Sequence, residues 1–529
     1  MPIEESPLES NRKQSVPAFP SYLQDISSFS LKPSFEQVSC LEDIKKLFPS
    51  ISGLPLLLKG NHQTKNRESR KKIGVVFSGG QASGGHNVIA GLFDALTQQG
   101  GELIGFLGGP SGIIKKNYKI LSKKEIFAFR NTGGFDLLGS GRTKIETEEQ
   151  LQSALTTCQE LCLDGLVIIG GDDSNTNAAV LAEYFHQNTC KTCVVGVPKT
   201  IDGDLKNSYV SVSFGFDSAT RVYSELIGNL ARDALSAKKY YHFVRLMGRS
   251  ASHITLECAL ATHPNFALIA EEVAAKQMTF KAIVQDLCNL IIARNKQGKS
   301  YGIVLIPEGL LEFTPDVSSL IQELNEILSK GDFSLDLLSS ASQECFLSFP
   351  EAIQKQLLLA RDPHGNVQLS LIETERLLAE MVYQEMQSRG VKDFYPLSHF
   401  FGYEGRSGFP SRFDSSYCYT LGLTAALLVS NQASGYMCFV SNLHKPVSEW
   451  DIGGVPLASL MRMELRKGKN KPVIEKALVD LQGNAFKTFS NVREGWKEED
   501  CYAFPGPIQL SELGSMEIPI SLRLEKGVF

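Results

Sequence analysis

Two acidic clusters, each directly after a short apolar run, are the residues of this chain best suited to chemistry. The first lies in Gly170–Ser174, with the sequence GGDDS, and the second in Pro198–Asp204, with the sequence PKTIDGD. Together they hold four carboxylates and one lysine, namely Asp172, Asp173, Asp202, Asp204 and Lys199. Oxygen ligands suit Mg²⁺, and a cation near a moving phosphoryl group stabilises it. These residue types indicate metal-assisted phosphate chemistry.

The spacing within each cluster suggests which carboxylates bind the metal and which act as a base. Asp172 and Asp173 at the end of a strand suit Mg²⁺, which keeps several of its waters when carboxylates bind it. Asp202 and Asp204 are two residues apart, so they point the same way if the turn is extended, and one can act as a base on a hydroxyl group. Lys199 can hold the transferred group. For any single aspartate near a strand end, a helix N-cap or a turn residue is the alternative.

Parallel strands are needed to bring the two clusters together. The apolar runs Leu166–Ile169 and Val194–Val197 are separated by a helical pattern, which predicts two strands with a crossover helix. Open α/β sheets bind ligands at the carboxyl ends of such strands. The same plan of strand, glycine, charged residue and helix recurs from Ile73, Tyr241 and Tyr301. We therefore expect an α/β fold with two doubly wound, Rossmann-like lobes.

Glycine-rich turns add candidate phosphate contacts. Ser78–Asn87 follows the apolar strand Ile73–Phe77 and precedes a helical pattern, so backbone N–H groups and a helix N-terminus would face an anion there. The turn lacks the ending of a P-loop and is not a clean GxGxxG. Arg142 and Lys144 leave a second glycine-rich stretch and suit phosphate contact. A tight turn and a solvated basic turn are the respective alternatives.

The overall composition limits the class of protein. The chain has 529 residues, a formal net charge of -5 and 43% apolar residues, which fits two to four globular domains. The small charge argues against a nucleic-acid binder, and no apolar run reaches the roughly 18 residues that suggest a membrane span. Eleven scattered cysteines and no visible signal peptide favour a reducing, cytoplasmic setting. Cys190 and Cys193 form a lone CxxC without a second ligand pair, which favours ordinary cysteines.

Seven segments resemble, in their order, those of the phosphofructokinases. Within that family the chain is most similar to the long-chain, pyrophosphate-dependent phosphotransferases that act on fructose 6-phosphate. The resemblance spans about residues 73–425, and the N-terminal extension is also similar to that of the long form. The segments are Ser78–Gly80, Gly139–Arg142, Gly170–Asn177, Pro198–Asp204, Met247–Arg249, Pro307–Gly309 and Tyr403–Arg406.

The segment pattern and the resemblance together imply a domain plan. Residues 1–72 would form an N-terminal extension that wraps the core. Residues 73–218, completed by about 415–529, would form the lobe that binds pyrophosphate and Mg²⁺. Residues 219–414 would form the lobe that binds fructose 6-phosphate, with a helical insertion at about 313–395.

The resemblance also implies a role for each matching residue. Asp202 would take the proton from the sugar 1-hydroxyl, with Asp204 as a second catalytic carboxylate, and Asp172 would help to hold Mg²⁺. Gly79 would place a backbone N–H against pyrophosphate. The remaining substrate contacts would come from Arg142, Thr200, Ile201, Met247, Gly248, Arg249, Glu308, Tyr403, Glu404, Gly405 and Arg406.

Lys239 and Tyr240 occupy the place where the family has a contact to the substrate of the neighbouring subunit. Many members carry an arginine there, so this pair departs from the family pattern. A substrate contact shared between subunits requires at least a dimer, and we expect a homodimer.

Asp173 and Lys199 indicate the phosphoryl donor. ATP-dependent members of the family have glycine at the position of Asp173, which leaves room for the nucleotide α-phosphate. Two like charges about 4 Å apart cost on the order of 4 kcal/mol at an effective dielectric near 20, which is roughly a thousandfold in affinity at about 1.4 kcal/mol per tenfold. Pyrophosphate has no α-phosphate, and Lys199 can stabilise the leaving phosphate. The resemblance therefore implies reversible, Mg²⁺-dependent transfer from pyrophosphate to fructose 6-phosphate.

Three other functions fit the sequence less well. An ATP-dependent phosphofructokinase would have to tolerate Asp173 beside a nucleotide. A non-catalytic regulatory subunit would keep the fold, but such members tend to lose active-site residues, and the expected ones are all present here. A nicotinamide-dependent oxidoreductase needs a clean GxGxxG with an acidic residue about 20 positions further on, which the chain lacks.

Overall fold

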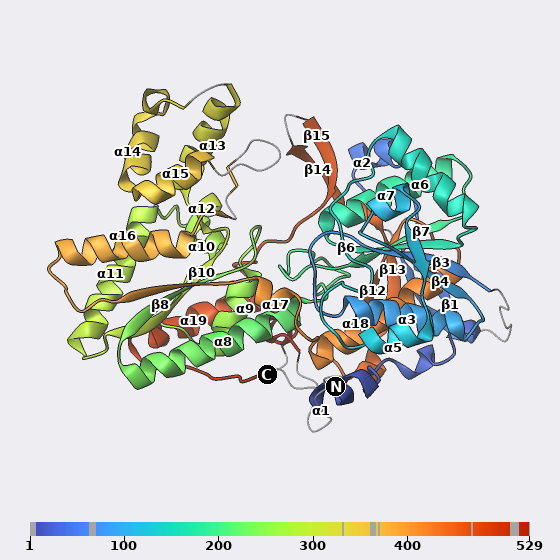
Figure 1. Ribbon diagram of the computed structural model, residues 1–529, viewed down its shortest axis with the longest axis horizontal. Coiled ribbons are helices and arrows are strands. Elements are labelled where there is room, and N and C mark those ends of the chain that lie inside the picture. The colour runs from blue at the N-terminus through green and yellow to red at the C-terminus, as the bar shows by residue number, and fades with distance from the viewer. Residues whose placement is uncertain are drawn as a thin grey trace, which may run out of the picture. The chain divides into compact units, whose positions relative to one another are not determined.

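The chain folds into two compact units, each with its own sheet and core (Figure 1). The computed structural model describes residues 7–36, 38–62, 70–330, 333–359, 367–368, 371–466, 469–507 and 518–527. Unit 1 comprises Met1–Ala219, Arg406–Ala477 and Ile508–Ile518, and unit 2 comprises Thr220–Gly405, Leu478–Pro507 and Pro519–Phe529. Within the described ranges, no helix is both long and apolar enough to cross a bilayer.

Unit 1 is built on a sheet that has nine strands among the described residues, in the order β1-β2-β13-β12-β7-β6-β3-β4-β5. The central strands β3, β6 and β7 are apolar and almost wholly buried, as is typical of parallel strands covered on both faces. Their register places Phe77 opposite Ile169 and Ile169 opposite Val197, so the three strands end level with one another. The strands are β1 (Phe29–Pro33), β2 (Leu57–His62), β3 (Lys72–Phe77), β4 (Glu102–Phe106), β5 (Tyr118–Ile120), β6 (Gly165–Gly170), β7 (Cys193–Pro198), β12 (Tyr436–Ser441) and β13 (Asp451–Pro456).

The helices of unit 1 begin and pack for local reasons. A capping box at Thr147 starts α6. Helices α3 and α18 approach closely at Gly91 and Gly422, where an added Cβ would lie 2.2 Å from the carbonyl oxygens of Tyr419 and Val88, respectively. The helices are α1 (Pro7–Gln14), α2 (Glu42–Leu47), α3 (Gly85–Thr97), α4 (Ser111–Ile114), α5 (Lys123–Phe129), α6 (Glu148–Glu160), α7 (Asp172–Gln187) and α18 (Arg412–Ser430).

The N-terminal extension is part of the unit 1 sheet. Strands β1 and β2 pair antiparallel, and β2 continues the sheet by pairing with β13 at Gly453 and Gly454. A side chain at Gly453 would clash, because its Cβ would lie 2.4 Å from the carbonyl oxygen of Leu57. Residues 1–6, 37 and 63–69 of the predicted extension lie outside the described residues. The segment that the sequence set apart as a wrapping extension thus also supplies two strands.

Unit 2 is built on a smaller sheet, which has four strands among the described residues, in the order β11-β8-β10-β9. All of its strand pairs are parallel. The strands are β8 (Tyr240–Leu246), β9 (Phe266–Ala267), β10 (Tyr301–Pro307) and β11 (Pro396–Phe401). The helices are α8 (Phe216–Ala237), which begins in unit 1, and α9 (His253–Thr262), α10 (Ala270–Ala275), α11 (Phe280–Lys296), α12 (Leu310–Phe313), α13 (Pro315–Lys330), α14 (Ser340–Ser348), α15 (Glu351–Leu359), α16 (Thr374–Ser388), α17 (Tyr403–Arg406), α19 (Asn484–Glu498) and α20 (Ile520–Glu525).

The predicted helical insertion at about 313–395 contains α13 to α16 and is packed into unit 2. Its side chains, Phe346 among them, share one apolar core cluster with Phe243 of β8. A buried ion pair joins the same two parts, since Nε of Arg245 on β8 lies 2.7 Å from Oε2 of Glu375 on α16. The insertion therefore continues the core of this unit.

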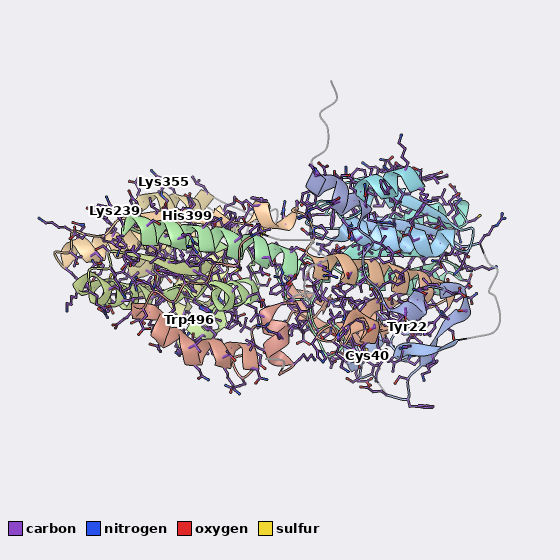
Figure 2. The ribbon with its side chains drawn as sticks, turned by 90° about the horizontal axis from the view of Figure 1, so that it is seen from below. Tyr22, Cys40, Lys239, Lys355, His399 and Trp496 are labelled. Atoms are coloured by element: carbon purple, nitrogen blue, oxygen red, sulfur yellow. The ribbon has the colours of Figure 1, made fainter. Side chains whose placement is uncertain are left out.

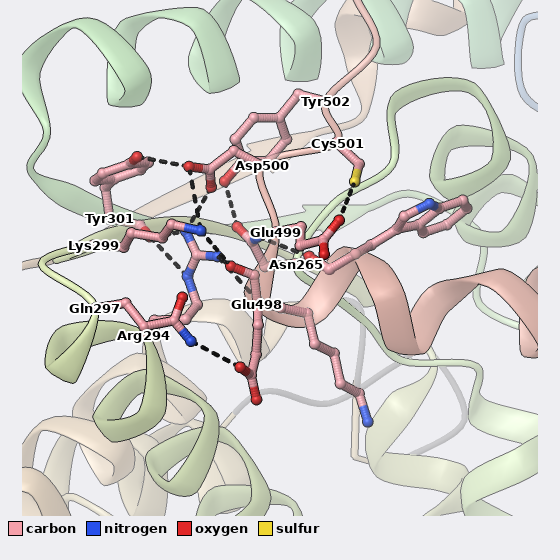
Figure 3. A network of polar contacts seen from close by, with 12 residues as sticks. Asn265, Arg294, Gln297, Lys299, Tyr301, Glu498, Glu499, Asp500, Cys501 and Tyr502 are labelled. Atoms are coloured by element: carbon pink, nitrogen blue, oxygen red, sulfur yellow. Dashed lines mark hydrogen bonds and ion pairs between the residues drawn. The ribbon is translucent and has the colours of Figure 1, made fainter.

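The C-terminal part of the chain divides between the units, which corrects the prediction that all of about 415–529 completes the first lobe. Leu478–Pro507 and Pro519–Phe529 belong to unit 2. Figure 3 shows one reason: Arg294 of α11 is fully buried and donates to Asp500 at 2.9 Å and to two backbone carbonyls of the same segment at 3.1 Å. A buried charge requires such partners, and the C-terminal segment supplies them.

Candidate active site

The two acidic clusters lie at the carboxyl ends of β6 and β7. Gly170 pairs with Pro198, and the N–H of Lys199 donates to the carbonyl of Gly170 at 2.9 Å. The structure thus places the ends of the two strands side by side, as the sequence predicted. Asp172 and Asp173 are the first two residues of α7, where the positive end of the helix dipole favours negative charge.

Asp172 and Asp204 share a lysine. Nζ of Lys476 lies 3.5 Å from Oδ2 of Asp172 and 3.5 Å from Oδ2 of Asp204. Burial raises the pKa of Asp172, and Lys476 opposes that shift. Burial also disfavours the charge of Lys476, but the carboxylates outweigh it and raise the pKa of the lysine. Lys476 therefore favours the charged form of Asp172, and the two carboxylates favour the charged form of Lys476.

The turn from Pro198 to Asp204 is not extended, which corrects the reasoning that placed Asp202 and Asp204 on one face. Gly203 has a φ of +73°, a left-handed conformation that interrupts the two-residue period of a strand. Asp204 is 4% exposed, whereas Asp202 is more accessible. The fold thus gives the two carboxylates different surroundings.

Thr200 and Ile201 stabilise this turn, the first through hydrogen bonds and the second through packing. Oγ1 of Thr200 accepts from the N–H of Asp202 at 3.1 Å, and the carbonyl of Thr200 accepts from Oγ of Ser213 at 2.8 Å. Ile201 is 6% exposed and packs next to Gly215, where an added Cβ would lie 3.3 Å from its Cγ2. The substrate contacts that the resemblance implies for both residues stay predictions.

Lys199 is buried beside the glycine-rich turn that follows β3. Burial lowers its pKa to about 8, although nearby aspartates, Asp202 foremost, act to raise it. An added Cβ on Gly79 would lie 3.5 Å from Nζ of Lys199, so the turn runs close to the ammonium group. The N–H of Gly79, which the resemblance assigns to pyrophosphate, donates instead to the carbonyl of Gly141 at 2.9 Å. The N–H of Gly79 already donates a hydrogen bond within the protein. The predicted contact with pyrophosphate therefore requires the hydrogen bond to Gly141 to break.

Cationic side chains border the same turn. Nζ of Lys144 lies 3.2 Å from Oδ1 of Asp173, and both side chains are about half exposed. Arg142 is exposed. Nη1 of Arg406 would lie 3.8 Å from a Cβ placed on Gly80. The cations predicted to contact phosphate are thus accessible around the turn, while Lys199 lies inside.

The oxygen donors around Asp172 and Asp204 fit Mg²⁺ that arrives with phosphate. One oxygen of each carboxylate lies 3.5 Å from a single point, the Nζ of Lys476. Mg²⁺ sites commonly use one or two carboxylates together with water and substrate phosphates. Over the described residues, no group of three or more His, Cys, Asp and Glu side chains is arranged to hold a metal unaided. Substrate oxygens and water would have to complete the ligand set.

Unit 2 carries a separate set of predicted residues, at the ends of β8 and β10. Glu308 is 6% exposed, and its Oε2 accepts from the N–H of Gly248 at 2.9 Å. Burial raises the pKa of Glu308 despite that hydrogen bond. Gly248 has a φ of +126°, and a Cβ on Gly309 would lie 2.1 Å from the carbonyl oxygen of Arg249. These glycines hold the turn of Met247 and Arg249 against Glu308.

The segment Tyr403–Arg406 forms α17, with Arg406 assigned to unit 1 and the rest to unit 2. Oε2 of Glu404 accepts from the N–H of Gly402 at 2.8 Å, so this carboxylate fixes the local turn. A Cβ on Gly405 would lie 2.5 Å from the ring of Tyr223. Tyr403 is 65% exposed. Of the residues predicted here, Tyr403 and Glu404 are exposed, and Gly405 serves close packing.

Lys239, labelled in Figure 2, is held against aromatic rings at the start of β8. Its Nζ lies 4.1 Å from the ring centroid of Tyr395 and 5.2 Å from that of Tyr240. Tyr240 has a φ of +78°, which marks a sharp entry into the strand. The contact of this pair with a neighbouring subunit stays a prediction.

Lys476 is a site residue that the sequence alone does not single out. It stands in an ordinary Glu-Lys-Ala stretch, without a glycine-rich turn or an acidic cluster to mark it. Its partner Asp204 lies about 270 residues earlier. No local pattern signals such a distant ion pair.

The seven segments lie within the part of the chain that matches one known protein family. A family model described as Phosphofructokinase matches residues 72–429. The chain belongs to the phosphofructokinase family. The family resemblance predicted from the motifs is thereby confirmed.

Relatives that match most of this phosphofructokinase chain share one name. Pyrophosphate–fructose 6-phosphate 1-phosphotransferase subunit beta 2 of Arabidopsis thaliana is 50% identical, covering 92% of this chain and 88% of that protein. Pyrophosphate–fructose 6-phosphate 1-phosphotransferase of Treponema pallidum is also 50% identical, with coverage of 92% and 91%. Subunit alpha 2 of the A. thaliana protein is 40% identical, with coverage of 99% and 90%.

Solved structures support the fold. The crystal structure of a pyrophosphate-dependent phosphofructokinase from Nitrosospira multiformis matches with a TM-score of 0.56 at 17% identity, covering 86% of this chain and 97% of that one. A second such protein, from Marinobacter aquaeolei, matches with a TM-score of 0.55 at 16% identity, with coverage of 84% and 98%. The predicted α/β phosphofructokinase fold is confirmed.

Proposed function

We propose that this chain transfers a phosphoryl group reversibly from pyrophosphate to the 1-hydroxyl of fructose 6-phosphate, giving fructose 1,6-bisphosphate and phosphate. The observation that carries the proposal is the pair Asp173 and Lys199, an accessible carboxylate at the start of α7 and a buried lysine beside the Gly79 turn. Relatives with half of their residues identical bear the name of this activity. Because pyrophosphate and the product ester are close in free energy, the reaction runs in both directions.

The acceptor is activated by Asp202. Its carboxylate takes the proton of the 1-hydroxyl as that oxygen attacks phosphorus, a step for which a positioned base contributes about 10²–10⁴-fold. The hydrogen bond from its own N–H to Thr200 holds the turn that carries it. Asp204 is paired with Lys476 and serves as a charge partner.

The donor is selected by Asp173 and steadied by Lys199. With a pKa of about 8, Lys199 is mostly protonated at neutral pH and can stabilise the leaving phosphate. Asp173 takes the place that a nucleotide α-phosphate would need, and the repulsion between such charges is on the order of 4 kcal/mol. Pyrophosphate ends before that position and binds without the repulsion.

Asp172 would hold Mg²⁺, with Asp204 as the nearby second carboxylate. When bound, Mg²⁺ neutralises the pyrophosphate oxygens and orients them for transfer. The start of α7 adds its positive dipole end to the same place.

Residues of unit 2 bind the sugar phosphate. The guanidinium of Arg249 is exposed and suits the 6-phosphate, because its forked donors match phosphate oxygens. Glu308 is fixed by the N–H of Gly248 and can accept a hydrogen bond from a sugar hydroxyl. Tyr403 supplies an exposed ring and hydroxyl.

The working form is a cytoplasmic homodimer in which Lys239 and Tyr240 reach the substrate of the neighbouring subunit. All eleven cysteines are free thiols, which is typical of a reducing compartment. Light scattering on the purified protein should give twice the chain mass. A monomer with full activity would contradict this arrangement.

A coupled assay tests the donor. Purified protein with fructose 6-phosphate and Mg²⁺ should form the bisphosphate with pyrophosphate, and at most weakly with ATP. Robust use of ATP without use of pyrophosphate would identify an ATP-dependent kinase instead, and no turnover with either donor would indicate a regulatory subunit.

The Asp173→Gly variant tests the residue that carries the proposal. We expect pyrophosphate-dependent kcat/KM to fall by about tenfold or more and ATP to become a usable donor, above all when Lys199→Gly is added. Asp173→Asn is the matched control, because it keeps the size of the side chain and removes its charge. Unchanged kinetics in Asp173→Gly would remove the role assigned to this carboxylate.

A further inference from the structure

A lysine from the C-terminal part of unit 1 enters the carboxylate cluster. Lys476 follows the hairpin of β14 (Met461–Arg466) and β15 (Lys469–Ile474). Its Nζ lies at the same distance, 3.5 Å, from an oxygen of Asp172 and an oxygen of Asp204. One ammonium group thus joins the start of α7 to the turn after β7.

Backbone hydrogen bonds on either side fix the position of Lys476. The N–H of Ile474 donates to Oγ1 of Thr176 at 3.0 Å, on the helix that Asp172 begins. The N–H of Ala477 donates to the carbonyl of Asp204 at 2.7 Å. The chain is therefore tied to both elements that carry the carboxylates, and its side chain is directed between them.

The other lysines of the cluster are placed differently. Lys199 lies beneath the Gly79 turn, and Lys144 pairs with Asp173 at 3.2 Å where both are about half exposed. The side chain of Lys476 is 30% exposed, between these extremes, and can withdraw toward solvent while its backbone stays bonded. The ammonium group of Lys476 lies between the carboxylates of Asp172 and Asp204. A divalent cation bound by both carboxylates would occupy the same space.

We propose that Lys476 is the counter-cation of the metal-free site and is exchanged for the divalent cation. The idea rests on the assignment of Asp172 as a metal ligand made above. An ammonium group between Asp172 and Asp204 offsets their mutual repulsion, and it also repels a bare divalent cation that approaches the same oxygens. A cation that arrives with pyrophosphate brings anionic oxygens, toward which the displaced ammonium can turn. Lys476 therefore favours loading of the metal together with pyrophosphate over loading of the metal alone.

Direct binding of Mn²⁺, followed by electron paramagnetic resonance at pH 8, tests the exchange. For Lys476→Met, which keeps most of the length of the side chain and removes its charge, we expect Kd for bare Mn²⁺ to fall by about tenfold relative to the unchanged protein. The ratio of Kd without pyrophosphate to Kd with pyrophosphate should shrink by at least a similar factor. Lys476→Arg keeps the charge and should restore the original ratio.

Matched variants distinguish the exchange of Lys476 for the metal from the assignment of Asp172 as a metal ligand, on which the exchange depends. Lys471→Met removes a lysine from the same hairpin, one that pairs distantly with Glu146 at 3.9 Å, and should leave Mn²⁺ binding unchanged. If Asp172→Asn binds Mn²⁺ as the unchanged protein does, the metal site itself is wrongly assigned. If Asp172→Asn loses Mn²⁺ while Lys476→Met keeps the original Kd and ratio, the exchange proposal alone is overturned.

Thermal unfolding gives a second readout that does not depend on turnover. Without metal, Lys476→Met and Lys476→Gln leave two carboxylates facing each other, so their Tm should lie below that of the unchanged protein. Added Mn²⁺ should raise the Tm of these variants by more than it raises that of the unchanged protein. An equal rise in all three proteins would overturn the exchange.

Discussion

Two candidate carboxylates of unit 1 are held by charge, whereas a candidate carboxylate of unit 2 is held by backbone geometry. In unit 1, Asp172 and Asp204 are placed by an ion pair with Lys476. In unit 2, Glu308 is placed by the N–H of Gly248, a residue whose conformation favours glycine. The difference would suit the two tasks that we propose for the units: phosphoryl transfer needs charges that can respond to a moving anion, whereas recognition of a sugar needs a fixed shape.

Burial acts on both sets and shifts the pKa of an acid and of a base in opposite directions. It lowers the pKa of Lys199 to about 8 and raises the pKa of Glu308. Both shifts favour the neutral form, because a buried charge loses its hydration. In unit 1, several neighbouring carboxylates oppose the lowering of the Lys199 pKa, but burial outweighs them, and the resulting pKa of about 8 makes the charge of the lysine sensitive to pH near neutrality.

The largest effect should follow a change of the base in unit 1. Asp202→Asn keeps the size of the side chain but cannot accept the proton, so we expect kcat to fall by about 1000-fold, within the range for a positioned base. Initial rates with pyrophosphate measure it, and calorimetric binding of fructose 6-phosphate should be little changed. Asp43→Asn, at a carboxylate whose side chain is 70% exposed in another ion pair, is the control. A kcat within tenfold of the original would remove Asp202 from the chemical step.

A smaller effect should follow alkaline pH. Lys199 loses its proton as pH rises through about 8, and the neutral amine no longer stabilises phosphate. The value of kcat/KM for pyrophosphate should therefore fall from pH 7 to pH 9 by about tenfold, since one pH unit above the pKa leaves about a tenth of the group charged. In Lys199→Arg the guanidinium stays protonated, so this decline should flatten whatever the absolute rate. The same decline in both proteins would show that another group titrates.

The smallest effect should come from unit 2. Glu308→Gln keeps an acceptor for the N–H of Gly248 but removes the carboxylate, so we expect KM for fructose 6-phosphate to rise by about fivefold, on the scale of one ordinary neutral hydrogen bond. The value of kcat should change by less than KM. Steady-state kinetics at saturating pyrophosphate measure both. A fall in kcat as large as that of Asp202→Asn would break the contrast between the two units.

The sequence by itself determined the fold class, the family and the location of the acidic clusters. These features are local: apolar runs predict strands, and the residues after Ile169 and Val197 must lie at their ends. The motifs also predict Asp172, Asp173, Lys199 and Asp202 as site residues, because these residues lie within short, recognisable segments.

Only the tertiary structure decided how the charged residues are partnered. The left-handed Gly203 separates Asp204 from Asp202, and the return of the chain after β15 brings Lys476 to Asp204. Folding likewise buries Arg294, whose partners fix the C-terminal segment in unit 2. Such contacts join residues hundreds of positions apart, and their strength depends on burial. The periodicity of a sequence reports which face of an element is apolar, but it carries no information about which distant charge will lie opposite.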